Sequence, residues 1–205
     1  MESVARGGTR WKRFAVVMVP SVAATAAIGV ALSQGALAAS FSVSGQQFKV
    51  TADRLDGTGF GQYAAMDSGA TGDHPVAVVG IDKATITGLC QSVVVPVPVF
   101  GDVSMKLTAG APGGPKVEAS KLYIDADDLS TNATFNSVDI GVAVDKMTKG
   151  PGAHKGDKFL PGSFAQQASS VTFRDVKQRA WATTAGTFKL SGLGMKVQKG
   201  KHECY

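Results

Sequence analysis

After residue 40 the chain alternates between apolar and polar residues in short runs, and no long stretch follows the helical period. Successive side chains of a β-strand point to opposite faces, so a period of two is typical of strands with one buried face. The alternating apolar residues include Phe41, Val43, Phe48, Val50, Val103, Met105, Leu107, Val138, Ile140, Val142 and Val144. The alternation therefore predicts an all-β fold.

Glycine-rich segments separate these runs. Residues 56–74, 109–116 and 149–162 hold many of the 25 glycines of the chain. Turns repeated at short intervals are typical of sheets that double back on themselves. We therefore expect a Gly-rich antiparallel β-sandwich or a barrel-like fold, with a β-solenoid as the alternative. Residues 164–168 are expected to form one helical turn.

One apolar run contains two prolines. Val93–Phe100 reads VVVPVPVF, with Pro96 and Pro98 between the valines. Proline has no N–H group to donate to a neighbouring strand, so it is confined to edge strands and irregular segments. The run therefore predicts an edge strand or an extended segment.

The N-terminus has the three parts of a secretory signal peptide. Arg10, Lys12 and Arg13 precede the uncharged stretch 14–32, and Ala36 and Ala38 follow it with the small-x-small spacing of a cleavage site. We predict that residues 1–38 are a signal peptide cleaved after Ala38. Residues 39–205 then form a single exported β domain, preceded in the uncleaved chain by an apolar helix.

The alternative is an uncleaved membrane anchor formed by residues 14–32. Nineteen residues at about 1.5 Å each just span the hydrocarbon core of a bilayer. Pro20 and the many alanines make this stretch only mildly apolar. With either outcome, residues 39–205 are expected outside the cytoplasm, in the extracellular space or the cell envelope.

Export makes the two cysteines informative. Cys90 and Cys204 are the only cysteines of the chain, and an oxidising compartment favours a disulfide between them. Such a bond would enclose 113 residues and tie the C-terminus to the interior of the chain. The alternative is two free thiols.

Charge is concentrated at the two ends of the chain. Residues 1–38 hold four basic residues and one acidic residue, so the remainder is only slightly basic and we expect no nucleic-acid partner. Residues 171–205 hold seven basic and two acidic residues, including Lys196, Lys199, Lys201 and His202. This tail is suited to an anionic envelope polymer or to lipid headgroups. The alternative is a solvated last strand whose lysines prevent aggregation at a sheet edge.

The sequence lacks the common signatures of catalysis and of cofactor binding. No Gly-x-Ser-x-Gly motif occurs, and neither do phosphate-loop or dinucleotide motifs, so we assign no catalytic residue and no cofactor. His74, His154 and His202 are the only candidate bases, and their neighbours Asp73 and Glu203 are placed on opposite sides of an extended chain from the adjacent histidines.

The densest group of oxygen ligands is Asp125, Asp127 and Asp128. The following residues do not fit an EF-hand, because Ser130 and Asn136 stand where glycine and glutamate are needed. A calcium ion bridging a turn between strands is one interpretation of this cluster, and a plain exposed turn is the other. The spacing of the histidines does not favour zinc.

The order of several segments resembles a known family. These segments are the leader, FSVSGQQFKV at residues 41–50, Gly88-Leu89-Cys90-Gln91, and Lys199-Gly200-Lys201-His202-Glu203-Cys204. They resemble small exported actinobacterial proteins of unknown function, some of which are labelled cholesterol esterase. The resemblance implies an envelope setting beside a membrane-protein partner, and its two cysteines match the predicted bond.

These observations favour an exported protein of the cell envelope with a structural or binding role and no enzymatic activity. Its expected partners are an envelope lipid, an anionic polymer or a membrane protein. The alternative function is a carboxylic ester hydrolase acting on a lipid or sterol ester.

Overall fold

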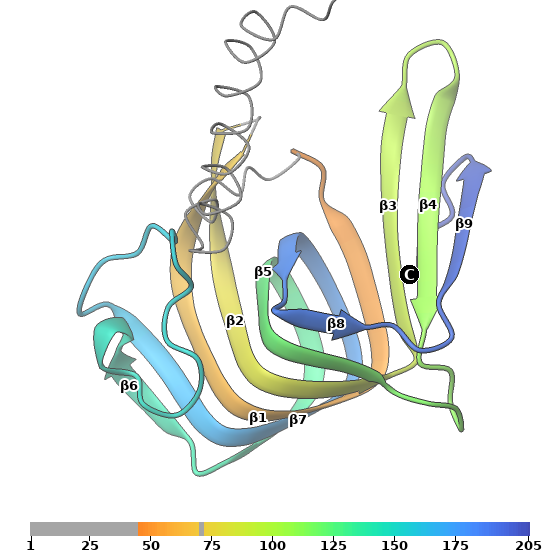
Figure 1. Ribbon diagram of the computed structural model, residues 1–205. Coiled ribbons are helices and arrows are strands. Elements are labelled where there is room, and N and C mark those ends of the chain that lie inside the picture. The colour runs from red at the N-terminus through yellow and green to blue at the C-terminus, as the bar shows by residue number, and fades with distance from the viewer. Residues whose placement is uncertain (1–44, 70–71) are drawn as a thin grey trace, which may run out of the picture. The chain divides into compact units, whose positions relative to one another are not determined.

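The computed structural model describes residues 45–69 and 72–205 (Figure 1). The predicted signal peptide, its cleavage site and the apolar helix at 14–32 lie outside the described residues. No helix in the described part of the chain is long and apolar enough to cross a membrane.

The described residues are built almost entirely from β-strands, which confirms the all-β prediction. The only helical element among them is the short 3-10 turn Val144–Lys146, and every strand pairing is antiparallel. The predicted helical turn at 164–168 is wrong, because these residues begin β7. The strands are β1 Phe48–Gly69, β2 Gly72–Thr87, β3 Leu89–Val97, β4 Gly101–Ala109, β5 Val117–Asn136, β6 Asp139–Ala143, β7 Phe164–Thr184, β8 Thr187–Lys189 and β9 Gly194–Lys199.

The strand pairing forms a circuit with an extension. β1 pairs with β2, β2 with β5, β5 with β7, and the end of β7 pairs with the start of β1. Beyond this circuit β3 pairs with the start of β1, on the edge that β2 occupies further along, and β4 and β9 continue the sheet outward from β3. Figure 1 shows these three strands standing beside the strongly curved long strands, and we call them the arm. The antiparallel pairing differs from the stacked coils of the β-solenoid alternative.

Gly88 marks the point where the arm leaves the rest of the sheet. β2 and β3 pair with β1 in one unbroken register, from Gly69↔Gly72 to Phe48↔Val93. Their outer partners differ, because β2 pairs with β5 and β3 pairs with β4. Gly88 has a φ of +68°, and a Cβ there would overlap with the Asp53 carboxylate. A glycine is therefore needed at this corner.

The sheet buries side chains on both faces. The main core contains Phe60, which contacts Phe135 and Phe173 with ring centroids 5.1 and 6.0 Å apart. A second core around Tyr63 lies on the opposite face, since residues three apart in a strand point to opposite sides. The segment 147–163, which we call the strap, packs on this second core through Met147, Ala153 and Phe159.

Candidate functional site

One face of the arm carries a patch of exposed apolar side chains, which we call the apolar face. Directly paired residues in an antiparallel sheet share a face. Val93, Met105 and Val197 form one such row, and Leu107 and Met195 belong to the next. Met105, Met195 and Val197 are exposed, with 64% of Val197 accessible to solvent. The patch consists of Val93, Val95, Val97, Val103, Met105, Leu107, Met195 and Val197.

The apolar face continues the side of the sheet that holds the main core. Val93 is paired with Phe48, and both Phe48 and Leu107 pack against the main core. Along β3 and β4 the same face therefore passes from buried side chains at the base of the arm to exposed side chains at its tip. In an isolated molecule the outer part of this face has no covering layer among the described residues.

The tip of the arm is the turn between β3 and β4. β3 pairs with β1 only as far as Val93, so one edge of its segment 94–97, which contains Pro96, has no partner strand among the described residues. In the turn, Val99 is fully exposed and has a φ of +69°, and Phe100 is 67% exposed. Two large apolar side chains thus project at the end of the arm. The ammonium group of Lys199 lies 5.8 Å from the centre of the Phe100 ring.

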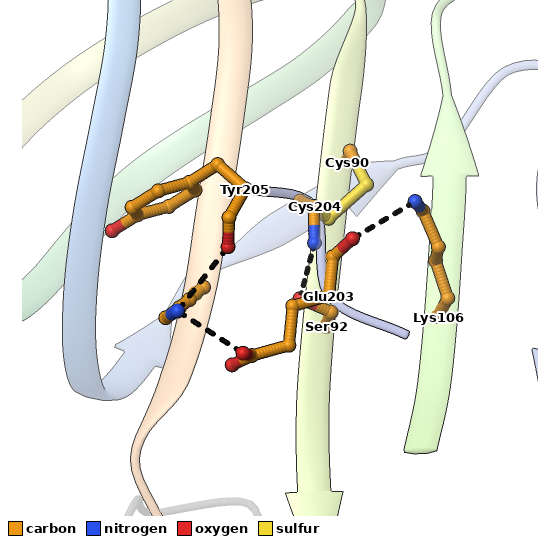
Figure 2. The surroundings of a disulfide bond; sticks show 7 residues. Cys90, Ser92, Lys106, Glu203, Cys204 and Tyr205 are labelled. Carbon is orange, nitrogen blue, oxygen red and sulfur yellow. Dashed lines mark hydrogen bonds and ion pairs between the residues drawn. A yellow bond between two sulfur atoms is a disulfide. The ribbon is translucent and has the colours of Figure 1, made fainter. Parts of the chain in front are cut away.

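The opposite face of the arm is covered by the C-terminal residues (Figure 2). Cys90 and Cys204, the pair expected from the sequence, form a disulfide with their Cα atoms 6.0 Å apart. The backbone N–H of Cys204 donates to the Ser92 hydroxyl at 3.0 Å, and Lys106 donates to the Glu203 carbonyl at 3.2 Å. The disulfide is consistent with an extracellular or exported location.

Two more contacts hold the end of the tail. Lys49 on β1 forms an ion pair with Glu203 at 3.1 Å and donates to the Tyr205 carbonyl at 3.2 Å. On β4, the hydroxyl of Ser104 is almost fully buried, donates to the Gly200 carbonyl and accepts the N–H of His202 at 2.9 Å. The tail therefore gives the arm one polar, rigidly held face, opposite the exposed apolar face.

A second group of polar side chains lies under the strap. Asp67 on β1 and Asp125 on β5 share a hydrogen bond between their carboxyl groups, and Asp157 of the strap lies close enough to repel both. We call these three residues the acid cluster. Burial, followed by the neighbouring negative charges of Asp67 and Asp157, raises the pKa of Asp125 to about 8. Burial also raises the pKa of Asp67, whose buried Oδ2 has no hydrogen-bond partner among the described residues.

The histidines show whether a hydrolase site is formed. The Nδ1 atom of His154 lies 3.3 Å from Asp157, but the hydroxyl bonded to Asp157 is that of Tyr63, which also accepts the N–H of His154. The Nε2 atom of His202 lies 3.1 Å from the backbone carbonyl of Lys199. Neither histidine therefore takes part in a Ser–His–carboxylate triad within the described residues.

The third histidine, His74, packs against a tryptophan. Its ring stacks on the indole of Trp181, with centroids 3.8 Å apart and planes 11° apart. Trp181 is the extra residue of a β-bulge, because Asp125 pairs with Ala182 while Ala126 pairs with Ala180. A bulge re-aims a side chain, and here it places the indole against the histidine.

The calcium candidates do not form a turn. Asp125, Asp127 and Asp128 lie inside β5, so the predicted turn between strands is wrong. Asp125 bonds with Asp67, whereas Asp127 accepts hydrogen bonds from Arg179 at 2.9 Å and from Gln47. Within the described residues, no three His, Cys, Asp or Glu side chains converge in a way that could hold a metal ion.

A small apolar cavity lies within the curved sheet. It has a volume of about 40 Å³ and lies at the base of the arm, where its lining includes Leu89, Gln91, Gln178 and Phe188. A cavity of this size holds a water molecule or a few methylene groups. It therefore offers no room for a whole lipid chain.

Sequence reasoning missed the exposed tip of the arm and the acid cluster under the strap. Val99 and Phe100 carried a usable signal, because an apolar pair after two prolines cannot be buried in a central strand. Asp67 and Asp157 carried none, since they meet Asp125 only through contacts between distant segments.

Comparison with known families and proteins identifies the group to which the chain belongs. Residues 44–205 match the model of a family of unknown function (DUF6230), and the chain is a member of that family. Searches of curated proteins and of solved structures gave no match.

Proposed function

We propose that this member of the family is an exported, non-enzymatic protein of the cell envelope that acts by binding a partner through the apolar face of the arm. The observation that carries the proposal is the exposure of Met105, Met195 and Val197 on one face of a sheet. Large contiguous apolar patches on a soluble protein mark sites that bind another surface.

The opposite face supports the same conclusion. The disulfide and the hydrogen bonds of Ser92 and Ser104 hold the strands of the arm in a fixed arrangement. A preorganised surface loses little conformational entropy when it binds. The arm is thus a rigid element with one face held by the tail and one face free to bind.

The proposal includes the predicted export. Residues 1–38 would act as a signal peptide, and the disulfide would form in the oxidising compartment that the protein enters. A cell-envelope lipid, an anionic polymer and a membrane protein are the partner classes that suit an apolar patch bordered by lysines.

Sedimentation with isolated envelope fragments tests the proposal. The secreted, oxidised protein is expected to sediment with the fragments, and the double variant Met105→Thr with Val197→Thr is expected to stay in solution. Ile140→Thr on β6 is the control, since Ile140 is about as exposed as Val197 but lies outside the arm. Equal sedimentation of all three proteins, or of none, would contradict the proposal.

Ester hydrolysis is the competing activity, and it is tested on the same preparation. The binding role predicts no turnover of short-chain or long-chain acyl esters. Turnover that a serine-directed covalent inhibitor abolishes would replace the binding role with the hydrolase.

A further inference from the structure

We infer that the partner of the arm is an anionic lipid bilayer, into which the tip residues Val99 and Phe100 insert. This inference rests on the proposed function, because it names the partner of the same binding surface. It is carried by two features of the arm, which are its tip and the cation beside that tip.

The tip has the shape and chemistry of a membrane-inserting turn. Val99 is fully exposed and Phe100 is 67% exposed, at the end of a hairpin that projects beyond its neighbours (Figure 1). The transfer of two exposed apolar side chains from water into a lipid phase is favourable, and a lipid phase needs no matching pocket to accept them. Next to them, Val95 and Val97 extend the apolar surface along β3.

Cations lie directly behind the tip. Lys199 is paired with Val103 on the apolar face, and its ammonium group lies 5.8 Å from the Phe100 ring centre. A lysine in this position can keep its stem among apolar groups while its ammonium reaches the lipid phosphates. Lys201 follows just after β9, whereas Lys196 lies further from the tip, paired with Lys106 on the opposite face of the arm.

The acidic groups of the arm do not cancel this charge. Asp102 follows the tip, but Lys201 lies 3.7 Å from it, and Glu203 is paired with Lys49 at 3.1 Å. Lys201 and Asp102 therefore balance each other, and the surface close to Phe100 combines apolar side chains with the positive charge of Lys199. This combination fits the headgroup boundary of an anionic bilayer, where surface potential attracts lysines.

A second copy of this chain fits the surface less well. The exposed edge of the arm is β9, which carries Lys196 and Lys199. Two copies joined across the apolar face would place Lys199 of each copy on the shared surface, and the lysines of β9 oppose pairing of two copies along this edge. Positive charge thus favours a negatively charged lipid over a positively charged copy.

Binding to vesicles of defined composition tests the inference with the secreted, oxidised protein. We expect binding to phosphatidylcholine vesicles that contain phosphatidylglycerol and much weaker binding to vesicles of phosphatidylcholine alone. Phe100→Ser should weaken binding to the anionic vesicles by about tenfold or more, because it removes a large apolar side chain from the inserted tip. Leu160→Ser is the matched control, since Leu160 on the strap is 77% exposed and distant in sequence from the arm.

The contribution of charge and the insertion of the tip are measured by separate experiments. Lys199→Gln should weaken binding to anionic vesicles by about fivefold and leave binding to phosphatidylcholine unchanged, whereas Lys155→Gln on the strap should change neither. Phe100→Trp should add tryptophan emission that shifts to shorter wavelength on binding and is quenched by brominated lipid. Leu160→Trp should add emission that does neither.

Four other outcomes would overturn membrane insertion, and they show whether the proposed function fails with it. Sedimentation with envelope fragments without vesicle binding would leave the proposed function standing and would make the partner a protein or a polymer. Vesicle binding that is indifferent to Phe100→Ser would contradict insertion of the tip. A dimer in light scattering that Phe100→Ser dissociates would assign the surface to a second copy. No binding to fragments or vesicles would remove both proposals.

Discussion

Asp125 and Asp67 hold their carboxyl groups against each other on the face of the sheet that the strap covers, although they are 58 positions apart in the sequence. Their hydrogen bond requires a proton, and Asp125, whose pKa is raised to about 8, retains a proton at neutral pH. Asp157 adds a third carboxylate from the strap and makes loss of the proton more costly. This contact makes the folded state sensitive to pH.

Stability should therefore fall as pH rises from about 4 to about 8. In this range the folded protein retains a proton on Asp125, whose pKa is about 8, whereas the unfolded chain has lost it. The free energy of unfolding should decrease by at most about 1.4 kcal/mol per pH unit and should level off above pH 8. Urea unfolding at a series of pH values measures the slope.

Asp125→Asn supplies the control for this prediction. The amide cannot titrate, so the variant should lose most of the slope while retaining a hydrogen bond to Asp67. Asp127→Asn changes the neighbouring carboxylate of β5, which bonds with Arg179, and should leave the slope in place. A slope that survives in Asp125→Asn would show that the carboxyl pair is not its source.

The disulfide should contribute strongly to stability. Replacing both Cys90 and Cys204 by serine releases a loop of 113 residues in the unfolded chain, and the loop-entropy account gives a loss of about 4–5 kcal/mol as an upper figure. Urea unfolding of the oxidised wild type and the variant measures the loss. A difference below about 1 kcal/mol would show that the other contacts of the tail hold it without the disulfide, such as the hydrogen bonds of the buried Ser92 and Ser104 hydroxyls.

The corner at Gly88 should not tolerate a side chain. Gly88→Ala places a Cβ on the Asp53 carboxylate and imposes a left-handed conformation, which alone costs about 1–2 kcal/mol. Gly113→Ala is the matched control, because Gly113 has a similar φ of +78° but open space around it. Thermal unfolding should show a larger loss for Gly88→Ala. Equal losses would mean that the contact with Asp53 relaxes without cost.

Tyr63 should hold the strap on the sheet. Its hydroxyl donates to Asp157 and accepts the N–H of His154 at 2.8 Å, so Tyr63→Phe leaves two strap groups unsatisfied. A loss of about 1–3 kcal/mol is expected, with faster hydrogen exchange in residues 147–163. Tyr123→Phe, which removes a single bond to the Gly152 carbonyl, should have a smaller effect. Unchanged hydrogen exchange of residues 147–163 in Tyr63→Phe would show that apolar contacts, and not the Tyr63 hydroxyl, hold the strap on the sheet.

The sequence by itself determined the strand character of the chain. Alternation at Val103, Met105 and Leu107 identified β4, because the period of side chains along a strand is a local property. The pairing of Cys90 with Cys204 also followed from the sequence, since no other cysteine competes. Pro96 correctly marked an edge of β3 that has no partner among the described residues, because a missing N–H has the same consequence in any sheet, and Pro98 lies in the turn that follows.

Only the tertiary structure decided which strands are neighbours and which residues meet. Alternation is the same for a buried and an exposed row, so it did not show that Val197 and Met195 remain exposed while Val117 and Leu122 are buried. The residues at 164–168 have no strong local preference and became a strand through pairing with β6. The acid cluster assembles from three segments whose separation in the sequence leaves no periodic signal. Contacts between distant strands depend on register and on how the sheet curves, and both are set by the packing of the whole domain.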